Sequence, residues 1–416
     1  MKKSILLSGL LALTLCLGAC SSEMDDIAPA GQDGQKSHTT AKSYDADYFP
    51  ETDDAKSLPT NTATALSRLL TADAMNLDFA RTMGEMTITD AQFAEIKAYV
   101  DENLKDSTET ATYENIFKWV TSNLTYAWSG DAYLDPYDVF VYKRCICQGY
   151  ANLCRTMLLT QGIPTLGANG QLGNVGAHAW LYAYVDGAWI VSDPTNSQYY
   201  KMSELAKYKN SLLVQRVDIP LFEDDNFQYG FENSTLVVTK VKKCDGEALT
   251  VPYSAGGYIV RQFVPRTEIP SNVRQLYFGT NITSFGPDEM PLFDTAPNVE
   301  EAYVDAASTS FSSEEGVVYK RKSSTPVYIP RGIRRLVLRP MTTIGKNVVY
   351  GLTNVEEIVI SEGTKTVEAY AIEGCPNLKT VYVPETVTSF DENAIYRCGD
   401  NVEVVTMPTG IHHVTI

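Results

Sequence analysis

Beginning at Cys147, apolar and small side chains recur at the spacing of a helix. They occupy offsets of 0, 3, 4, 7, 10 and 11 residues, which places them on one face of a helix with about 3.6 residues per turn. Gly162, followed by an isoleucine and a proline, is a typical helix end. The pattern therefore predicts a largely buried helix whose first turn contains Cys147, with Gln148, Asn152 and Arg155 on the opposite face.

A second pattern, an alternation of apolar and polar residues, follows this helix and is interrupted by Asp186-Gly187. Aspartate followed by glycine is a strong signal for a two-residue hairpin turn. We expect the residues that flank the turn, Val185 and Ala188, to pair with each other. In that register His178 and Asp193 are diagonal neighbours on one face, about 7–8 Å apart at the backbone. The register alone therefore brings a carboxylate within reach of an imidazole.

Helical patterns also precede Cys147. Thr89-Asp-Ala-Gln92 is a capping-box pattern that predicts the start of an amphipathic helix extending to about Leu104. A second helix is expected from about Tyr113 to Asn123. We interpret Ser129 to Tyr142 as a loop that leads into the Cys147 helix and forms one wall of a cleft, and Lys201 to Gly230 as a closing segment of mixed structure.

Beyond about Asn233 the chain consists of short β-rich runs with a repeated pattern. Similar runs begin at Asn354, Asn377 and Asn401, at spacings of 23 and 24 residues, and three apolar positions recur every 23 residues: Ile344, Val367 and Phe390. A period in the low twenties predicts a solenoid, with one strand expected in each coil.

Cys375 and Cys398 occupy equivalent positions of adjacent predicted coils. Neighbouring strands in a sheet are about 5 Å apart, and this spacing permits a disulfide. We favour two packed thiols over a disulfide.

The N-terminus has the features of an exported lipoprotein. Lys2 and Lys3 precede a short apolar run, and Leu17-Gly-Ala-Cys20 resembles the bacterial lipobox. We therefore expect residues 1–19 to be a signal peptide and Cys20 to carry a lipid, because the apolar run is too short for a stable transmembrane helix. Residues 20–59 are polar and acidic, as in a flexible tether.

The acidic residues just after Cys20, within Glu23-Met-Asp-Asp26, resemble the export signal of surface lipoproteins in the Bacteroidetes. The alternative is a solvated linker without a sorting role. We expect an outer membrane lipoprotein, with the cell surface favoured over the periplasmic side.

The charge balance excludes some partners. Without residues 1–19 the chain has 32 Lys and Arg (34 less Lys2 and Lys3) against 51 Asp and Glu, a formal charge of −19. Such a charge argues against nucleic acid and against direct adhesion to anionic lipid, so the lipid on Cys20 would provide the membrane contact. A hydrophobic content of 44% with 14 Phe and 25 Tyr is sufficient for two packed domains.

The three side chains Cys147, His178 and Asp193 are the parts that nucleophilic acyl chemistry requires. A thiol in the first turn of a helix is favoured as a thiolate, and its backbone N–H can stabilise an oxyanion. His178 is the expected base, because the other histidines lie in the polar leader or near the C-terminus. The less specific alternative is a core cysteine at a helix start.

The other cysteines are weaker candidates for the nucleophile. Cys145 precedes the predicted helix and should lack the field of its N-terminal amides, so we favour Cys147. Cys154 lies two turns further along the apolar face and is interpreted as packing. One Cys-x-Cys pair supplies too few ligands for a structural zinc site, and we expect no metal and no cofactor.

Residues 113–200 resemble the transglutaminase-like superfamily of papain-type thiol enzymes. The matching motifs are Ile116-Phe-Lys-Trp119, Leu124-Thr-Tyr126, the C-x-G-Y-A block at Cys147, Gln161-Gly-Ile-Pro164, His178-Ala-Trp180 and Asp193-Pro-Thr195. One departure is Cys145-Ile146, where the family often has Gly-Val. Large animal members depend on calcium, but no D-x-D-x-D-G loop occurs in this sequence.

This resemblance implies that Cys147 is the nucleophile, His178 the general base and Asp193 the residue that orients the base. It also implies an oxyanion donor upstream of the nucleophile, for which Tyr126 and Trp128 are candidates. Trp180 is a further candidate for the cleft.

The repeat pattern resembles the BspA-type leucine-rich repeats of bacterial surface proteins, which implies a binding function. The expected fold is therefore α+β, with a papain/transglutaminase-like domain at residues 60–232 and a β-rich leucine-rich-repeat solenoid at 233–416.

Three functions fit the sequence. The first is a surface-anchored cysteine protease, amidase or acyltransferase, with hydrolysis favoured over amine transfer and with repeats that bind a host or dietary protein or glycan. The second is a non-catalytic adhesin that binds through its repeats. The third is a periplasmic enzyme that acts on murein peptides.

Overall fold

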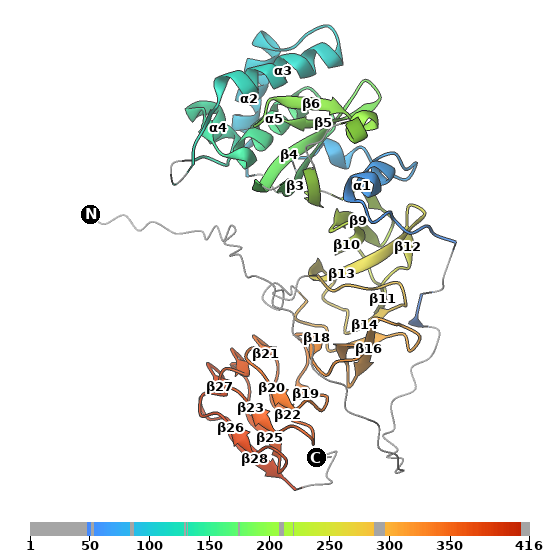
Figure 1. Cartoon of the computed structure of the whole chain (residues 1–416), viewed down its shortest axis with the longest axis vertical. Helices are drawn as coiled ribbons and strands as arrows, with labels where there is room; N and C mark the ends of the chain where they lie inside the picture. The colour runs from blue at the N-terminus through green and yellow to red at the C-terminus, as the bar shows by residue number, and fades with distance from the viewer. Residues whose placement is uncertain are drawn as a thin grey trace, which may run out of the picture. The chain divides into compact units, whose positions relative to one another are not determined.

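The computed structural model describes residues 48–50, 54–83, 87–128, 130, 132–173, 175–207, 212–218, 220–286 and 296–408 (Figure 1). The predicted signal peptide, Cys20 and most of the predicted tether lie outside the described residues. Among the helices that are described, none combines the length and the apolar character that a membrane span requires.

Helices make up most of the region before residue 161. They are α1 (Thr62–Leu70), η2 (Phe79–Arg81), α2 (Asp90–Asn103), α3 (Glu109–Asn123), α4 (Pro136–Tyr142) and α5 (Cys147–Thr160), and a short helix η3 (Met202–Lys207) follows later. The capping box of α2 is confirmed, since Thr89 and Gln92 each accept a hydrogen bond from the other's backbone N–H. The helix predicted at Cys147 is confirmed as α5. It ends just before Gly162, whose φ is +74°.

One detail of the helical prediction is wrong. The segment interpreted as a loop contains α4, which the Asp135 side chain caps by accepting hydrogen bonds from the N–H groups of Tyr137 and Asp138. Arg155, on the opposite face of α5, is also buried and is 3% exposed. Its guanidinium donates to the Thr82 carbonyl and lies near Asp218, because α5 is covered on both sides.

The strands after α5 form one ten-stranded sheet with the order β12-β13-β10-β9-β7-β3-β4-β5-β6, in which β8 also pairs with β9. Their bounds are β3 (Thr165–Leu172), β4 (Gly176–Val185), β5 (Ala188–Asp193), β6 (Gln198–Lys201), β7 (Leu212–Val217), β8 (Phe222–Glu223), β9 (Phe227–Glu232), β10 (Thr235–Val241), β12 (Ser254–Ala255) and β13 (Tyr258–Glu268). A separate two-stranded sheet joins β1 (Thr125–Tyr126) to β2 (Arg144–Cys145).

The sheet continues across the predicted domain boundary at 232/233. β9 and β10 form an antiparallel hairpin whose turn residues, Asn233 and Ser234, both have positive φ angles. Turns of this kind match the twist of paired strands. A division of the chain at this point would therefore separate two paired strands of one sheet.

Strand β4 contributes to two cores, one on each face of the sheet. Ala179, Leu181 and Ala183 pack with α2, α3 and α5 in one cluster of buried residues. Trp180 and Tyr182 pack with α1 and the later strands in another. This alternation fixes the register of β4, since a slip of one residue would exchange the two sets of side chains.

The C-terminal residues form a solenoid of short parallel strands. One ladder contains β19 (Arg335–Val337), β22 (Glu357–Val359), β25 (Thr380–Pro384) and β28 (Glu403–Met407); a second contains β20 (Thr343–Ile344), β23 (Thr366–Val367) and β26 (Ser389–Phe390); a third contains β21 (Val349–Tyr350), β24 (Ile372–Glu373) and β27 (Ile395–Tyr396). Ile344, Val367 and Phe390 pair in sequence, as predicted. Each coil has three short strands, however, so the prediction of one strand per coil is wrong.

Two three-stranded sheets are separate from the large sheet and from these ladders. β11 (Ala248–Thr250), β14 (Gln275–Phe278) and β15 (Glu301–Val304) pair in parallel, and β16 (Phe311–Glu314), β17 (Val317–Lys320) and β18 (Pro326–Tyr328) pair antiparallel. The fold is thus α+β, with a mixed N-terminal region followed by a β-solenoid, as predicted.

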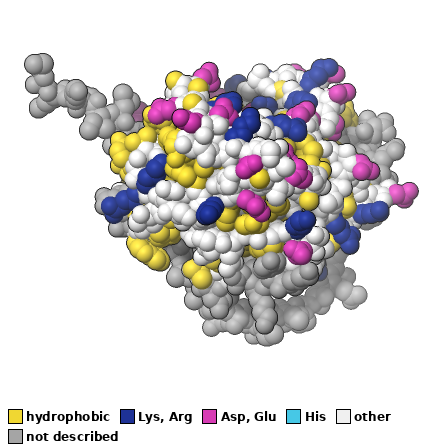
Figure 2. All heavy atoms as spheres, turned by 90° about the horizontal axis from the view of Figure 1, so that it is seen from above, with side chains coloured by type: hydrophobic (Ala, Val, Ile, Leu, Met, Phe, Trp, Pro, Cys, Tyr) yellow, Lys and Arg dark blue, Asp and Glu magenta, His cyan; other side chains and the backbone are white. Residues whose placement is uncertain are grey.

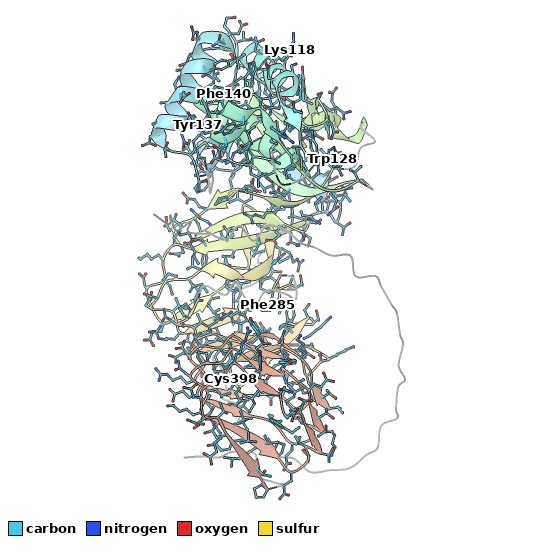
Figure 3. All side chains as sticks on the ribbon, turned by 90° about the vertical axis from the view of Figure 1, so that its left-hand side faces the viewer. Lys118, Trp128, Tyr137, Phe140, Phe285 and Cys398 are labelled. Atoms are coloured by element: carbon cyan, nitrogen blue, oxygen red, sulfur yellow. The ribbon has the colours of Figure 1, made fainter. Side chains whose placement is uncertain are left out.

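Cys375 and Cys398 are both free thiols and are hydrogen-bonded to each other. Cys375 is fully buried, whereas Cys398 (labelled in Figure 3) is partly exposed. The arrangement agrees with the favoured prediction of two packed thiols.

Gly170 provides a test of this architecture because it lies between two strands of the large sheet, paired with His178 on β4 and with Val214 on β7. A Cβ atom at this position would lie 2.0 Å from the Leu213 carbonyl oxygen, which belongs to the backbone and cannot rotate away. We expect Gly170→Ala to reduce the free energy of unfolding by about 1–3 kcal/mol, measured by urea denaturation. Gly246→Ala is the matched control, since a Cβ there meets only ordinary contacts, and equal effects of the two changes would contradict the packing described.

Candidate active site

Three elements bring the predicted catalytic side chains together. Cys147 is the first residue of α5, His178 lies on β4, and Asp193 is the last residue of β5. The predicted hairpin register is confirmed from Val185↔Ala188 to Leu181↔Ser192. His178 Nε2 lies 2.9 Å from Asp193 Oδ2, and both side chains are buried. The diagonal contact expected from the register is therefore present.

The thiol lies against the imidazole. Cys147 hydrogen-bonds with the His178 side chain and with the backbone N–H groups of Ala179 and Gln148. Because His178 Nε2 is engaged by Asp193, the other ring nitrogen, Nδ1, is the one available to the sulfur. The order of contacts is thus thiol, imidazole, carboxylate, as nucleophilic catalysis by cysteine requires.

These contacts shift both titrating groups in the direction of an ion pair. Burial opposes ionisation of the thiol, but the hydrogen bonds from His178 and from the Ala179 N–H outweigh it and lower the pKa of Cys147. Burial also opposes protonation of the imidazole, but hydrogen bonds with Asp193 and Cys147 outweigh it and raise the pKa of His178 to about 9. Near neutral pH the pair is therefore favoured as thiolate and imidazolium.

The rival cysteines lack this environment. Cys145 is fully buried among the side chains around α5, and burial followed by the proximity of Cys147 raises its pKa to about 12. Cys154 is also fully buried, and burial alone raises its pKa to about 12. Cys147 is partly exposed. A nucleophile must be both ionisable and accessible, so the geometry favours Cys147 over Cys145 and Cys154.

Among the aromatic candidates for the cleft, Tyr126 is the one that contacts the backbone of Cys147. Its hydroxyl oxygen accepts a hydrogen bond from the backbone N–H of Cys147, and pairing of β1 with β2 places Tyr126 opposite Cys145. Burial and then the proximity of Cys147 raise the pKa of Tyr126, so the phenol retains its proton and can donate it to an acceptor. An oxyanion donor needs these properties.

The two tryptophans differ in position. Trp128 (labelled in Figure 3) is 90% exposed, and its ring meets the Tyr126 ring edge-on at a centroid distance of 5.1 Å. Trp180 is fully buried, with its ring nearly parallel to that of His178 at 6.1 Å. Trp128 is therefore accessible to a substrate, whereas Trp180 packs beside His178 and is not a surface of the cleft, because alternation along β4 directs it into the core.

Two further contributors were not predicted. The Ala179 N–H reaches the thiol, but a backbone contact of this kind leaves no signal in the sequence. Asn196 donates a hydrogen bond from Nδ2 to Asp193 Oδ2 over 2.7 Å. Asn196 lies three residues after Asp193, in a turn that begins with proline. This position in the sequence could have indicated a contact with Asp193.

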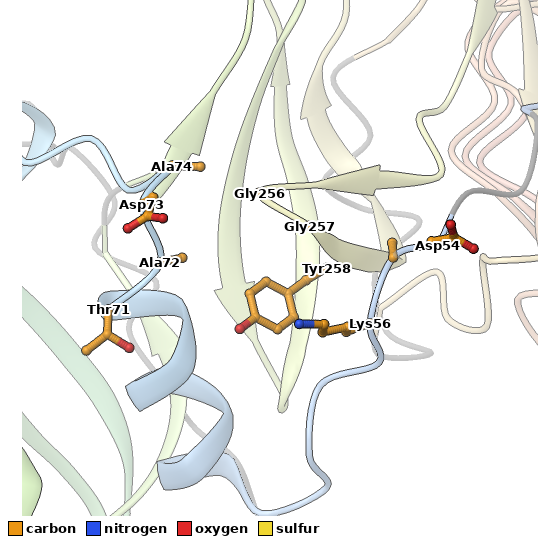
Figure 4. A pocket seen from close by; sticks show the side chains of 10 residues that line it. Asp54, Lys56, Thr71, Ala72, Asp73, Ala74, Gly256, Gly257 and Tyr258 are labelled. Atoms are coloured by element: carbon orange, nitrogen blue, oxygen red, sulfur yellow. The ribbon is translucent and has the colours of Figure 1, made fainter.

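The structure also has an open cavity of about 490 Å³ in another part of the described chain (Figure 4). It is lined by the segment before α1, which includes Lys56, by the residues just after α1, which include Asp73, and by the turn between β12 and β13 with the first residue of β13, Tyr258. None of its lining residues belongs to the Cys147 site, so it carries no part of the chemistry described above.

Two family models match parts of the chain. A model of the transglutaminase-like superfamily matches residues 95–194, and one of the BspA type leucine rich repeat region matches residues 337–415 in six copies. The chain therefore contains a transglutaminase-like core followed by BspA-type leucine-rich repeats. No curated protein matches the chain.

Several solved structures resemble parts of the chain. A candidate cysteine protease of Cytophaga hutchinsonii has 17% identity and a TM-score of 0.24, with 34% of this chain and 55% of that chain covered. LapG of Legionella pneumophila has 15% identity and a TM-score of 0.24, covering 39% and 87%. A leucine rich cell surface protein of Faecalibacterium prausnitzii has 12% identity and a TM-score of 0.19, covering 44% and 76%.

The chain thus spans about half the length of the Cytophaga protein.

The site predicts selective alkylation. At pH 6.5 we expect iodoacetamide to modify Cys147 while Cys145 and Cys154 stay unmodified, because among these three thiols Cys147 alone combines exposure with a lowered pKa. The thiolate persists below the ordinary thiol pKa of about 8.5. The alkylation rate of Cys147 in the wild type should therefore exceed that in His178→Ala at least about tenfold.

The measurement is peptide mass spectrometry of the labelled chain over time. Cys398 is an internal control, since its pKa is lowered to about 7 chiefly by its hydrogen bond with Cys375, away from His178. Its rate should be the same in both proteins. Equal rates at Cys147 in the two proteins would show that His178 does not activate the thiol.

Proposed function

We propose that this chain is a thiol enzyme that cleaves amide or peptide bonds, with Cys147 as nucleophile. The observation that carries the proposal is the continuous hydrogen-bonded series from Cys147 through His178 to Asp193. The transglutaminase-like superfamily, to which residues 95–194 are matched, provides the reaction class. Within that class the substrate would be a protein or peptide.

In the proposed reaction the Cys147 thiolate attacks the carbonyl carbon, and the carbonyl π-electrons move to oxygen. The imidazolium of His178 then donates its proton to the amine, the C–N bond breaks, and a thioester to Cys147 remains. In the second half His178, now neutral, takes a proton from water. The resulting hydroxide attacks the thioester and the C–S bond breaks. A carboxylic acid leaves, and Cys147 and His178 return to the thiolate and imidazolium pair. Asp193 holds the imidazole orientation in both halves.

The oxyanion of each tetrahedral intermediate would be stabilised by the Cys147 N–H and the Tyr126 hydroxyl. In the structure the Cys147 N–H donates to the Tyr126 oxygen. A substrate oxygen that enters between the two groups would take the place of the Tyr126 oxygen as the acceptor for this N–H. Donors arranged in advance of the reaction are the main source of stabilisation in such sites.

We favour hydrolysis over transfer to an amine because the entrance is open to water. Tyr126 is 37% exposed and Trp128 is 90% exposed, and both lie beside the nucleophile or its neighbour. Transfer requires a cleft that excludes water from the thioester. The exposed aromatic rings offer a surface for an apolar side chain of the substrate.

The location and the partner of the repeats are also part of the proposal. Lipidation at Cys20 would hold the chain at the outer membrane, facing the exterior, and repeats at residues 337–415 would bind a protein or glycan on the target. Binding in this way raises the local concentration of substrate at the thiol. Figure 2 shows a different face, seen from above the view of Figure 1, on which Lys and Arg are interspersed with Asp and Glu.

The proposal predicts that Cys147→Ala abolishes release of amines from a casein or peptide-library substrate, followed by fluorescamine. A wild type with no turnover of any peptide or glutamine substrate, together with a repeat region that binds a partner, would support a non-catalytic adhesin instead.

Tyr126→Phe removes one oxyanion donor and keeps the ring. We expect kcat to fall about 100-fold with little change in KM, since a lost donor acts on the transition state. Tyr142→Phe is the matched control, because Tyr142 is an exposed tyrosine that stacks on Tyr133 rather than on the nucleophile. Equal kcat values for the two variants would exclude Tyr126 as a donor.

A further inference from the structure

We propose that Asn196 is a positioning residue that fixes the Asp193 carboxylate in the orientation that meets His178. The inference rests on the proposed function, because it concerns the same site. It assigns a role to a side chain that neither the sequence motifs nor the matched family model singled out.

The first observation is the turn that follows β5. Asp193 pairs with Gln198 on β6, so residues 194–197 form a tight connection between the two strands. Within it Ser197 adopts a φ of +54° and donates its N–H to the Pro194 carbonyl over 3.3 Å. This conformation places Asn196 in contact with the carboxylate of Asp193, the last residue of β5.

The second observation is that Asn196 contacts both oxygens of that carboxylate. Its backbone N–H donates to Asp193 Oδ1 over 3.3 Å, and its Nδ2 donates to Oδ2 over 2.7 Å. Oδ2 is the oxygen that also faces His178 Nε2, at 2.9 Å. A carboxylate oxygen accepts two hydrogen bonds readily, so the two donors are compatible and together define one rotation of the carboxyl group.

Asp193 and Asn196 differ in their exposure to solvent. The Asp193 side chain is 5% exposed, whereas Asn196 lies at the surface. The amide therefore covers the carboxylate on its solvent side and supplies a donor where a water molecule would otherwise compete. Ser192, the preceding residue, is tied to Tyr113 on α3, so the backbone of β5 is held separately from the carboxylate. Loss of the Asn196 side chain should then affect orientation more than folding.

Among the described residues, two ionisable side chains interact with His178. Asp193 lies on one side, Cys147 on the other, and Tyr126 lies beyond the thiol. Asn196 acts on this set only through Asp193. Its effect should consequently appear as a change in how strongly the imidazole holds its proton, and hence in the ionisation of Cys147.

The test uses Asn196→Asp and Asn196→Ala in the full chain, with Ser197→Asn as the control. Asn196→Asp keeps the size and turn-forming character of the side chain but places an acceptor against the Asp193 oxygens. Asn196→Ala removes the side chain. Ser197→Asn alters the next residue and suits its left-handed conformation. The readouts are the thermal midpoint by circular dichroism and the pH dependence of iodoacetamide modification at Cys147.

We expect Asn196→Asp to slow alkylation of Cys147 at pH 6.5 about tenfold and to move its pH profile upward by about one pH unit, with a smaller change in Asn196→Ala. Ser197→Asn and the Cys398 rate should remain at wild-type values. Thermal midpoints should stay close to that of the wild type.

Two results would overturn the inference. One is a wild type with an activated Cys147 whose pH profile is unchanged in both Asn196 variants. The other is a slower alkylation of Cys147 in the Asn196 variants together with a loss of thermal stability that Ser197→Asn shows equally. In that case the turn would have only a structural role. A wild-type Cys147 that reacts like a free thiol would instead refute the proposed function, and this inference with it.

Discussion

The hydrogen bond between His178 and Asp193 is the interaction on which the site depends. It joins two strands of one hairpin, so the two-residue turn at Asp186 and Gly187 determines whether it forms. A slip of one residue in this register would move the carboxylate to the opposite face of the sheet. The alternation of β4 between two cores opposes such a slip, because it would exchange Trp180 and Tyr182 with the smaller side chains that face α5. Catalytic geometry and core packing are therefore enforced by the same pairing.

The second constraint is the position of the α5 N-terminus against β4. The first turn of a helix has unpaired N–H groups, and here those of Cys147 and Gln148 face Tyr126 and the thiol respectively. Helix α5 is held in place on both sides, by the apolar cluster with α2 and α3 and by buried Arg155, which reaches the Thr82 carbonyl. The sulfur is consequently presented to His178 by a rigid element, and it needs no movement of the backbone to be activated.

Much of this arrangement could be predicted from the sequence, because it is local. The period of 3.6 residues located α5, and Asp186-Gly187 fixed a register from which the His178 and Asp193 contact followed. In the repeats, Ile344, Val367 and Phe390 share a ladder because their spacing equals one coil.

The features that were not predicted depend on distant parts of the chain. Arg155 is buried because of Thr82 and Asp218, which no helical pattern contains. The three strands of each coil are two or three residues long in most cases, too short to show an alternation. The β9–β10 hairpin crosses position 232/233 because Asn233 and Ser234 both adopt positive φ angles, although neither is glycine.

The central claim is that Cys147 forms a covalent acyl intermediate with the help of His178. The most direct measurement is to mix the purified chain with a p-nitrophenyl ester, quench with acid within seconds and map the acyl group by mass spectrometry. We predict a burst of about one equivalent of p-nitrophenol, an acyl group on the peptide that contains Cys147, and loss of both in His178→Ala. An acyl group on other residues, or the same yield on Cys147 without His178, would contradict this account.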